Sequence, residues 1–210
     1  MSKPAIIFDL GGVLVDWNPR YLYRKLFVSE ADMEIFLRDI CDGDWNEQQD
    51  AGRPFAEGVA LLCAQHPEHT ALIRAFHERW IEMVAGPIEG TVEIFRELRA
   101  AGYQIAALSN WSAETWALTR PLYPFFDWFE EMVISGHEGV IKPNPRIYQI
   151  LLQRIGRRAH ECVFIDDSMK NIGAARAMGF RTIQFRSPEQ ARRELNAMQI
   201  LPTGAVGESA

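Results

Sequence analysis

The first apolar run of the chain, Ala5 to Phe8, is typical of a short strand that is buried on both faces of a sheet. A carboxylate, Asp9, follows the run at once, and two glycines after it allow the backbone to turn sharply. Ligands bind at the carboxyl ends of the strands in an open α/β sheet, so Asp9 is a candidate nucleophile, metal ligand or both. The alternative interpretation is an acid that caps a turn.

From about residue 17 to residue 86 the apolar positions recur three and four residues apart, which indicates helices. Four helical runs are expected, at 20–27, 29–40, 54–65 and 68–84. The polar, acidic segment 41–52 between them is expected to be a loop. We see no strand pattern between Trp17 and Ala85, so this part of the chain is predicted to be an all-helical unit.

Beyond residue 86, strand patterns and helix patterns alternate along the chain. Strands are expected at 103–108, 132–135, 162–165 and 181–185. Helices are expected at 91–101, after Ser112, from Asn144-Pro145 to Ile155, at 168–178 and after Ser187-Pro188. This order predicts an α/β fold: a doubly wound (Rossmann-like) parallel sheet with a helical cap inserted after strand 1. We assign residues 1–16 and 87–210 to the core and residues 17–86 to the cap.

Several of the expected strands end in a polar residue or lead into a loop that contains one. These residues are Asp9, Ser109, Lys142 and the pair Asp166-Asp167. If the strands are neighbours, the three carboxylates meet at one edge of the sheet and need a counter-charge to stay ionised. A divalent cation with hard oxygen ligands meets this need, and Mg²⁺ is the natural choice.

Mg²⁺ suits a phosphoryl substrate, whose oxygens complete its coordination. We therefore expect Asp9 to attack phosphorus and form an aspartyl-phosphate. Lys142 would offset negative charge, and Ser109 with nearby backbone N–H groups would hold the phosphoryl oxygens. Asn171 lies one helical turn beyond Asp167, where we expect it to orient Lys142 or the acid pair.

These residues stand in four motifs that resemble those of the haloacid dehalogenase-like (HAD) hydrolase superfamily, in the subgroup with a helical cap after the first strand. The motifs are Phe8-Asp9-Leu10-Gly11-Gly12-Val13, Leu108-Ser109-Asn110, Lys142-Pro143, and Phe164-Ile165-Asp166-Asp167-Ser168 with Asn171 and Gly173-Ala174 following. The resemblance implies catalysis by Asp9, Ser109 and Lys142. It implies Mg²⁺ bound by Asp9, the Gly11 carbonyl, Asp166 and Asp167. Substrate contacts are assigned to Leu10, Gly11, Ser109, Asn110 and Lys142.

Gly11 departs from the pattern of the superfamily. Most of its phosphatases carry a second Asp at this position, which protonates the leaving alcohol and then activates water. One interpretation is a phosphatase in which another acid takes over this role. The candidates are Asp16, Asp42, Asp44, Glu47 and Asp50.

Two other interpretations remain open. In a 2-haloacid dehalogenase, Asp9 would displace halide from carbon, which requires neither a proton donor nor a metal. This would explain Gly11 but would leave three close acids without a cation. The other is a catalytically weak protein of the same fold that binds a ligand, in which Asp9, Lys142 and the acid pair would have no use. We therefore favour the phosphatase.

Charge and cysteine content limit the partners further. The formal net charge of −6 argues against nucleic acid as a partner, and no apolar run approaches the ~20 residues that span a membrane. Cys41, Cys63 and Cys162 are scattered, as expected for reduced thiols in a cytoplasmic protein. We predict a cytoplasmic, Mg²⁺-dependent phosphatase that acts on a small phosphorylated metabolite, for which the resemblance offers a sugar phosphate. No pattern indicates an oligomeric state.

Overall fold

A five-stranded parallel sheet forms the centre of the computed structural model, which describes residues 3–201. Its strand order is β5-β4-β1-β6-β7. The strands are β1 (Ala5–Phe8), β4 (Ile105–Ser109), β5 (Glu131–Ile134), β6 (Cys162–Asp166) and β7 (Arg181–Gln184). Every residue of β1, β4 and β6 is buried, because helices cover both faces of the sheet. The predicted doubly wound α/β fold is thereby confirmed.

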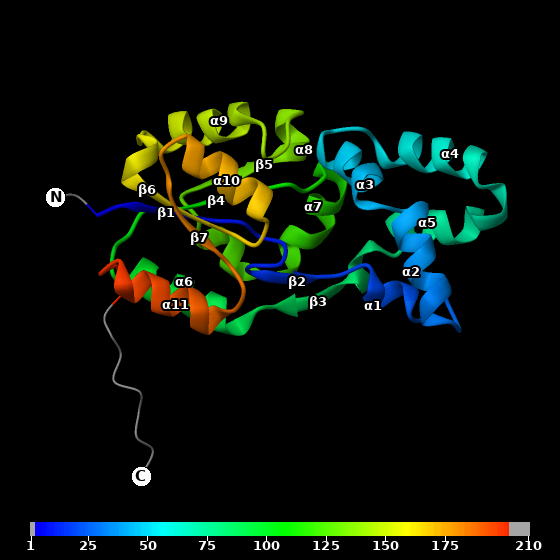
Figure 1. Cartoon of the computed structure of the whole chain (residues 1–210), viewed down its shortest axis with the longest axis horizontal. Coiled ribbons are helices and arrows are strands. Elements are labelled where there is room, and N and C mark those ends of the chain that lie inside the picture. Colours follow the sequence, from blue (N-terminus) through cyan, green and yellow to red (C-terminus); the bar gives the residue numbers. More distant parts are fainter. Residues whose placement is uncertain (1–2, 202–210) are drawn as a thin grey trace, which may run out of the picture.

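Two pairs of helices cover the sheet, one pair on each face (Figure 1). On one face lie α9 (Pro145–Ile155) and α10 (Met169–Ala177), and on the other lie α6 (Glu89–Ala100) and α11 (Pro188–Ala197). The start of α9 follows the sequence signals, because the Asn144 side chain accepts a hydrogen bond from the Arg146 N–H and Pro145 occupies the first turn. Gly156, with φ of 65°, ends the same helix in the left-handed conformation.

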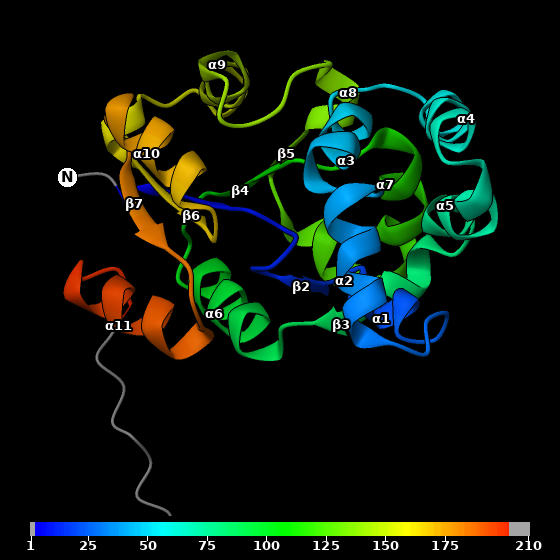
Figure 2. The same ribbon diagram turned by 45° about the vertical axis from the view of Figure 1, so that its right-hand side comes forward.

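The chain between β1 and α6 forms a helical unit at one end of the sheet (Figures 1 and 2). It contains α1 (Arg20–Tyr23), α2 (Glu30–Asp39), α3 (Gly43–Asp50), α4 (Phe55–Gln65), η1 (Pro67–His69), α5 (Thr70–Glu78) and η2 (Trp80–Met83). Two short antiparallel strands, β2 (Val15–Trp17) and β3 (Val84–Pro87), connect this unit to the core. A helical cap inserted after the first strand is therefore present.

Three details of the predicted helical unit were wrong. Strands β2 and β3 reach into the region expected to lack strands, because a pairing between residues 70 apart in sequence leaves no local pattern. The segment 41–52, expected to be a loop, contains α3, whose N-terminus is capped by Asp42. Only Gln49 and Asp50 of α3 are buried, so the helix has no apolar stripe. The run 68–84 is divided among η1, α5 and η2.

A helix begins shortly after each of the strands β4 and β5. The helix α7 (Ala113–Thr119) begins after Ser112, whose hydroxyl accepts a hydrogen bond from the Thr115 N–H, as the sequence predicted. The short helix α8 (Ser135–Glu138) begins at the last residue of the strand expected at 132–135, and no helix was expected there. The domain boundary at 17–86 stays a prediction, and residues 1–2 and 202–210 of the assigned core lie outside the described residues. Within residues 3–201, no helix is both long and apolar enough to cross a membrane.

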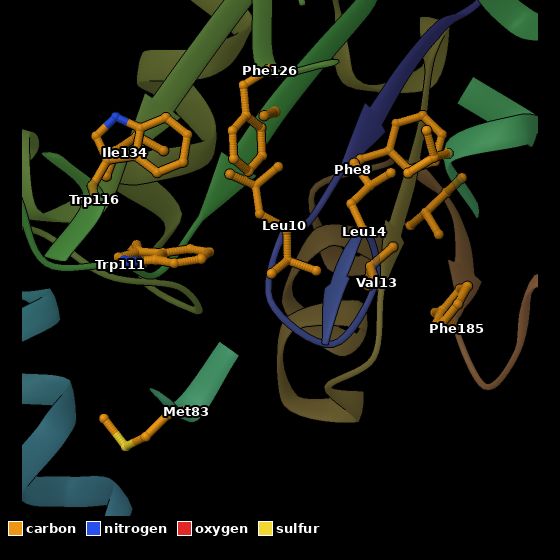
Figure 3. Close-up of a cluster of buried hydrophobic side chains, with 14 of the residues drawn as sticks. Phe8, Leu10, Val13, Leu14, Met83, Trp111, Trp116, Phe126, Ile134 and Phe185 are labelled. Atoms are coloured by element: carbon orange, nitrogen blue, oxygen red, sulfur yellow. The ribbon is translucent and has the colours of Figure 1, made fainter. Parts of the chain in front are cut away.

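One apolar cluster runs continuously from the underside of the sheet into the helical unit. Figure 3 shows part of it, with Phe8 and Leu14 near the sheet and Trp111 closer to the helical unit. The Trp111 ring packs against Trp80 of the helical unit, with ring centroids 6.4 Å apart. The cap and the carboxyl edge of the sheet therefore share one packed interior.

Candidate active site

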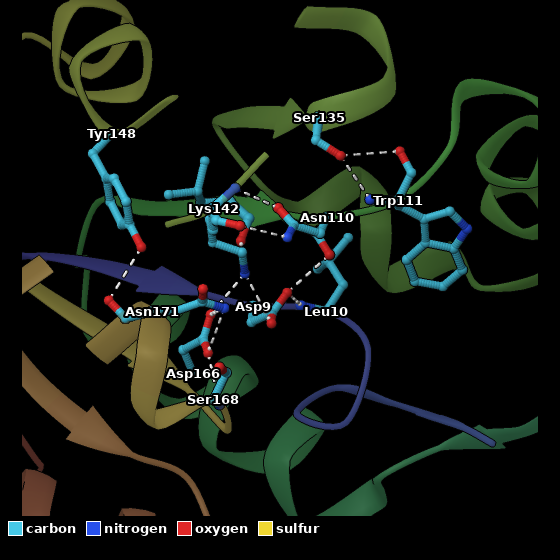
Figure 4. Close-up of polar contacts among 12 residues, drawn as sticks. Asp9, Leu10, Asn110, Trp111, Ser135, Lys142, Tyr148, Asp166, Ser168 and Asn171 are labelled. Carbon is cyan, nitrogen blue, oxygen red and sulfur yellow. Dashed lines mark hydrogen bonds and ion pairs between the residues drawn. The ribbon is translucent and has the colours of Figure 1, made fainter. Parts of the chain in front are cut away.

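Asp9 lies at the carboxyl end of the central strand, because β1 is flanked by β4 and β6. The residue is only 7% exposed. The carboxylate Oδ1 accepts hydrogen bonds from the Leu10 N–H at 2.7 Å and from the Ser109 hydroxyl at 2.8 Å (Figure 4). The Leu10 side chain is buried in the apolar cluster. Leu10 therefore faces the site only with its backbone.

Lys142 is buried beside Asp9 and forms three contacts through its ammonium group. The Nζ atom lies 2.9 Å from Asp9 Oδ2 and 2.7 Å from Asp166 Oδ2, and it donates to the Leu108 carbonyl at 2.9 Å. All three ammonium protons thus have acceptors. Burial alone would lower the pKa of Lys142, but the charges of Asp166 and Asp9 outweigh it and raise that pKa. Lys142 therefore carries its charge inside the protein.

Asn171 holds Asp166 in place from the first turn of α10. Its side-chain amide donates to both Asp166 oxygens, at 3.1 and 3.2 Å, and the Ser168 N–H donates to Asp166 Oδ1 at 2.8 Å. The carbonyl of Asn171 accepts a hydrogen bond from the Tyr148 hydroxyl at 3.1 Å. Figure 4 shows these side chains converging from α9 and α10. Asn171 was expected to orient Lys142 or the acid pair, and its amide contacts Asp166 of that pair.

Three carboxylates meet at this edge of the sheet. Oxygens of Asp9, Asp166 and Asp167 all lie within 4.8 Å of one another. Burial raises the pKa of Asp9 to about 7, and the charges of Asp166 and Asp167 act in the same direction, against Lys142. Burial, followed by the charge of Asp166, also raises the pKa of Asp167. An all-oxygen cluster with more negative than positive charge fits a hard divalent cation.

The two glycines after Asp9 differ in what the structure requires of them. Gly12 has φ of +74°, and a Cβ there would lie 2.5 Å from Asp167 Oδ2. Gly12 is therefore needed both for the backbone conformation and for the approach of Asp167. A Cβ on Gly11 would meet no atom of the described residues within 4 Å. There is thus room for a side chain at position 11, although the residue there is glycine.

Asn110 fixes the loop that carries Lys142. Its side-chain amide donates to the Lys142 carbonyl at 3.0 Å and accepts from the Lys142 N–H at 2.7 Å. Both ends of this amide are therefore occupied by the protein backbone. A substrate contact by Asn110 stays a prediction, whereas the structure shows its amide in a positioning role.

A cavity of about 840 Å³ lies above the carboxylates, between the core and the helical unit. Its walls include Asp9, Lys142 and Asp167 from the core. From the other side they include residues that sequence reasoning did not select: Trp17, Arg20, Arg38 and Asn46. No strand end marks these positions, so only the packing of the helical unit over the sheet could reveal them.

Comparison with known sequences agrees with this architecture. A family model described as haloacid dehalogenase-like hydrolase matches residues 3–179. The sesquiterpene phosphatase astK of Aspergillus oryzae is 26% identical over 190 residues, which cover 83% of this chain and 86% of the relative. The phosphoglycolate phosphatase of Mesorhizobium japonicum is 28% identical over 195 residues, covering 87% and 82%. Acyl-CoA dehydrogenase family member 10 of Mus musculus is 30% identical over 96% of this chain, which spans only 20% of that relative.

Solved structures share the fold. A HAD family enzyme of Bacteroides thetaiotaomicron, in complex with magnesium and inorganic phosphate, has a TM-score of 0.67 at 22% identity and covers 89% of this chain and 96% of its own. The L-2-haloacid dehalogenase of Xanthobacter autotrophicus, with chloropropionic acid covalently bound, has a TM-score of 0.63 at 19% identity and covers 96% and 85%. With the family model matching most of its length, the chain belongs to the haloacid dehalogenase-like hydrolase family.

Proposed function

We propose that this hydrolase is a Mg²⁺-dependent phosphatase that transfers the phosphoryl group of a small phosphomonoester first to Asp9 and then to water. The observation that carries the proposal is the meeting of a buried Lys142–Asp9 pair with a cluster of three carboxylates at the carboxyl edge of the sheet. Relatives named as phosphatases, of which this chain covers 86% and 82%, support the same reaction class. A cavity of about 840 Å³ suits a small metabolite.

The residues present fit a magnesium ion. Asp9, Asp166, Asp167 and the Gly11 carbonyl would supply its oxygen ligands. Asp167 is the more exposed residue of the acid pair, whereas hydrogen bonds and an ion pair engage both oxygens of Asp166. A bound cation would offset the charge of the acids and of the phosphoryl oxygens. The magnesium and phosphate in the Bacteroides thetaiotaomicron structure of the same fold agree with this assignment.

The chain's own residues would carry the chemistry. A bond forms between a carboxylate oxygen of Asp9 and phosphorus while the bond from phosphorus to the leaving oxygen breaks. Lys142 favours the ionised form of Asp9 and stabilises negative charge on the transferred group, and the Ser109 hydroxyl orients the nucleophile. Water then attacks phosphorus, which releases phosphate and restores Asp9.

A 2-haloacid dehalogenase is the second candidate, because Gly11 supplies no leaving-group acid and halide needs none. The structural likeness to an L-2-haloacid dehalogenase extends to the fold. The crowded carboxylates oppose this alternative. Their negative charge already exceeds the positive charge of the single lysine, and an anionic haloacid would add to it. A catalytically weak binding protein is opposed by the same cluster, which a scaffold would not need.

The test is hydrolysis of p-nitrophenyl phosphate, whose leaving group needs no acid, with Mg²⁺ or with EDTA. We expect Mg²⁺-dependent turnover that Asp9→Asn abolishes while the melting curve shows that the fold is retained. Asp44→Asn, an exposed carboxylate of α3, is the control and should retain turnover. Halide release from 2-chloropropionate without metal is measured alongside. Metal-independent halide release, or full phosphatase activity in Asp9→Asn, would overturn the proposal.

The predicted cytoplasmic location is part of this proposal. Cys41, Cys63 and Cys162 all have free thiols in the structure. Free thiols are expected in the cytoplasm, where disulfides are rare.

A further inference from the structure

Asp50 is a buried carboxyl group on the cap, and it faces the reaction site. It is the last residue of α3, and it is 7% exposed. It lines the same cavity as Asp9 and Lys142. It also lines a smaller hollow of about 70 Å³, and the core side of that hollow includes Gly11. Asp50 thus lies across a small space from the position at which a side chain is missing.

The four other acids that could replace the missing side chain are placed differently. Asp16, on β2, accepts a hydrogen bond from the Tyr21 hydroxyl, and Asp42 caps α3. Asp44 is exposed, and Glu47 lies 4.0 Å from a lysine at the rim of the cavity. Among the five candidates, only Asp50 is both buried and in the hollow against Gly11.

The hollow itself is built to accept a polar group. Trp17, Trp80 and Trp111 line it together with Asn46. Within residues 3–201, the indole N–H groups of these tryptophans and the Asn46 Oδ1 atom are buried and have no hydrogen-bond partner. Buried donors without partners are rare, because leaving them unpaired opposes folding. Three donors and one acceptor around one small space therefore suit the oxygens of an alcohol.

Resting on the proposed phosphatase function, we propose that Asp50 is the general acid and base that takes the place of the side chain absent at Gly11, and that the hollow receives the leaving alcohol. As the bond from phosphorus to the alcohol oxygen breaks, the protonated carboxyl of Asp50 gives its proton to that oxygen. The alcohol leaves, and Asp50 becomes a carboxylate. Asp50 then takes a proton from the water that attacks the phosphorus on Asp9, so the cycle ends with Asp50 protonated.

The surroundings of Asp50 suit both halves of this cycle. Burial raises its pKa to about 7; a hydrogen bond from the Ser112 backbone and the charge of Lys142 oppose the rise, and Glu47 adds to it. The C-terminus of α3, at which Asp50 lies, also disfavours a negative charge. One carboxylate oxygen accepts from the Asn46 amide at 3.1 Å, which fixes the side chain. An acid that titrates near neutrality can both donate and accept a proton.

The test compares two esters that differ in their need for an acid: p-nitrophenyl phosphate and glycerol 2-phosphate. The measured quantity is kcat/KM, which reports the steps up to the release of the first product. Asp50→Asn should lower kcat/KM for glycerol 2-phosphate by about 10²–10⁴-fold, the usual contribution of general acid catalysis. The value for p-nitrophenyl phosphate should stay nearly unchanged. Asp44→Asn on the same helix is the matched control, and both values should persist.

A structural role of Asp50 is separated from a catalytic one by rescue. Gly11→Asp places a carboxyl where a Cβ has no described atom within 4 Å. Added to Asp50→Asn, it should restore much of the lost kcat/KM for glycerol 2-phosphate, with the single Gly11→Asp variant as its control. An equal loss for both esters, no loss for either, or a selective loss that Gly11→Asp leaves unrepaired overturns this inference. A wild-type protein without Mg²⁺-dependent hydrolysis of p-nitrophenyl phosphate overturns the proposed function instead.

Discussion

Lys142→Met tests whether charge balance holds the candidate site together. Methionine keeps an unbranched apolar stem of similar length but removes the ammonium, which lies 2.9 Å from Asp9 and 2.7 Å from Asp166. Removing one partner of a buried ion pair costs about 3–5 kcal/mol, because the remaining charge stays buried without compensation. At about 2–4 °C per kcal/mol for a protein of this size, the melting temperature at pH 8 should fall by about 6–20 °C.

The loss should depend on pH and on magnesium. Burial already raises the pKa of Asp9 to about 7, and without the lysine that pKa rises further. At pH 5.5 Asp9 is then protonated and neutral, so Lys142→Met should lose less stability there than at pH 8. At pH 8, Mg²⁺ should restore part of the melting temperature by supplying positive charge to the same carboxylates.

The assay is thermal unfolding followed by circular dichroism at both pH values, with and without Mg²⁺. Lys170→Met is the matched control, since Lys170 lines the same cavity but its side chain is 65% exposed and lies 4.0 Å from Glu47. Exposed pairs of this kind contribute about 0–1 kcal/mol. An equal loss at the two pH values, or as large a loss in Lys170→Met, would show that the charge of Lys142 does not stabilise the site through Asp9 and Asp166.

Three further predictions concern neighbouring positions. Gly12→Ala, which puts a side chain at φ +74° and 2.5 Å from Asp167, should cost about 1–2 kcal/mol in urea unfolding and weaken Mg²⁺ binding measured by calorimetry. Asn171→Ala, which removes the amide donor to buried Asp166, should cost about 1.5–3 kcal/mol by the same unfolding assay. Asp50 has a folded pKa of about 7 against an ordinary 3.8, so its stabilisation is complete below pH 4 and lost as pH rises through 7. The stability of Asp50→Asn relative to wild type should therefore be higher at pH 8 than at pH 5. A difference in stability that is the same at both pH values contradicts this.

Local sequence signals were enough to predict most of the core. Strands β1, β4 and β6 are short apolar runs that end in a polar residue or lead directly into one, and Asn144-Pro145 and Gly156 mark both ends of α9. The sequence also selected the residues that converge at the site, because parallel strands end at one edge. Which strands are neighbours, however, is a long-range property, and only the structure shows β1 between β4 and β6.

The cap side of the site could not be predicted in the same way. The segment that contains α3 has few apolar residues, so its helix was missed and the burial of Asp50 with it. The bonds from the Asn110 amide to the backbone of Lys142, a partner 32 residues away, were not predicted. The tryptophans around the small hollow come from three separate segments. Such contacts depend on how the cap packs against the sheet, which no local pattern encodes.

An aspartyl-phosphate on Asp9 can be detected by mass spectrometry of the protein quenched with acid during turnover of p-nitrophenyl phosphate. We expect a phosphoryl group on the peptide that contains Asp9, present with Mg²⁺, absent with EDTA and absent in Asp9→Asn. Steady turnover in which this peptide stays unmodified, or a phosphoryl group that forms equally well without metal, would contradict this expectation.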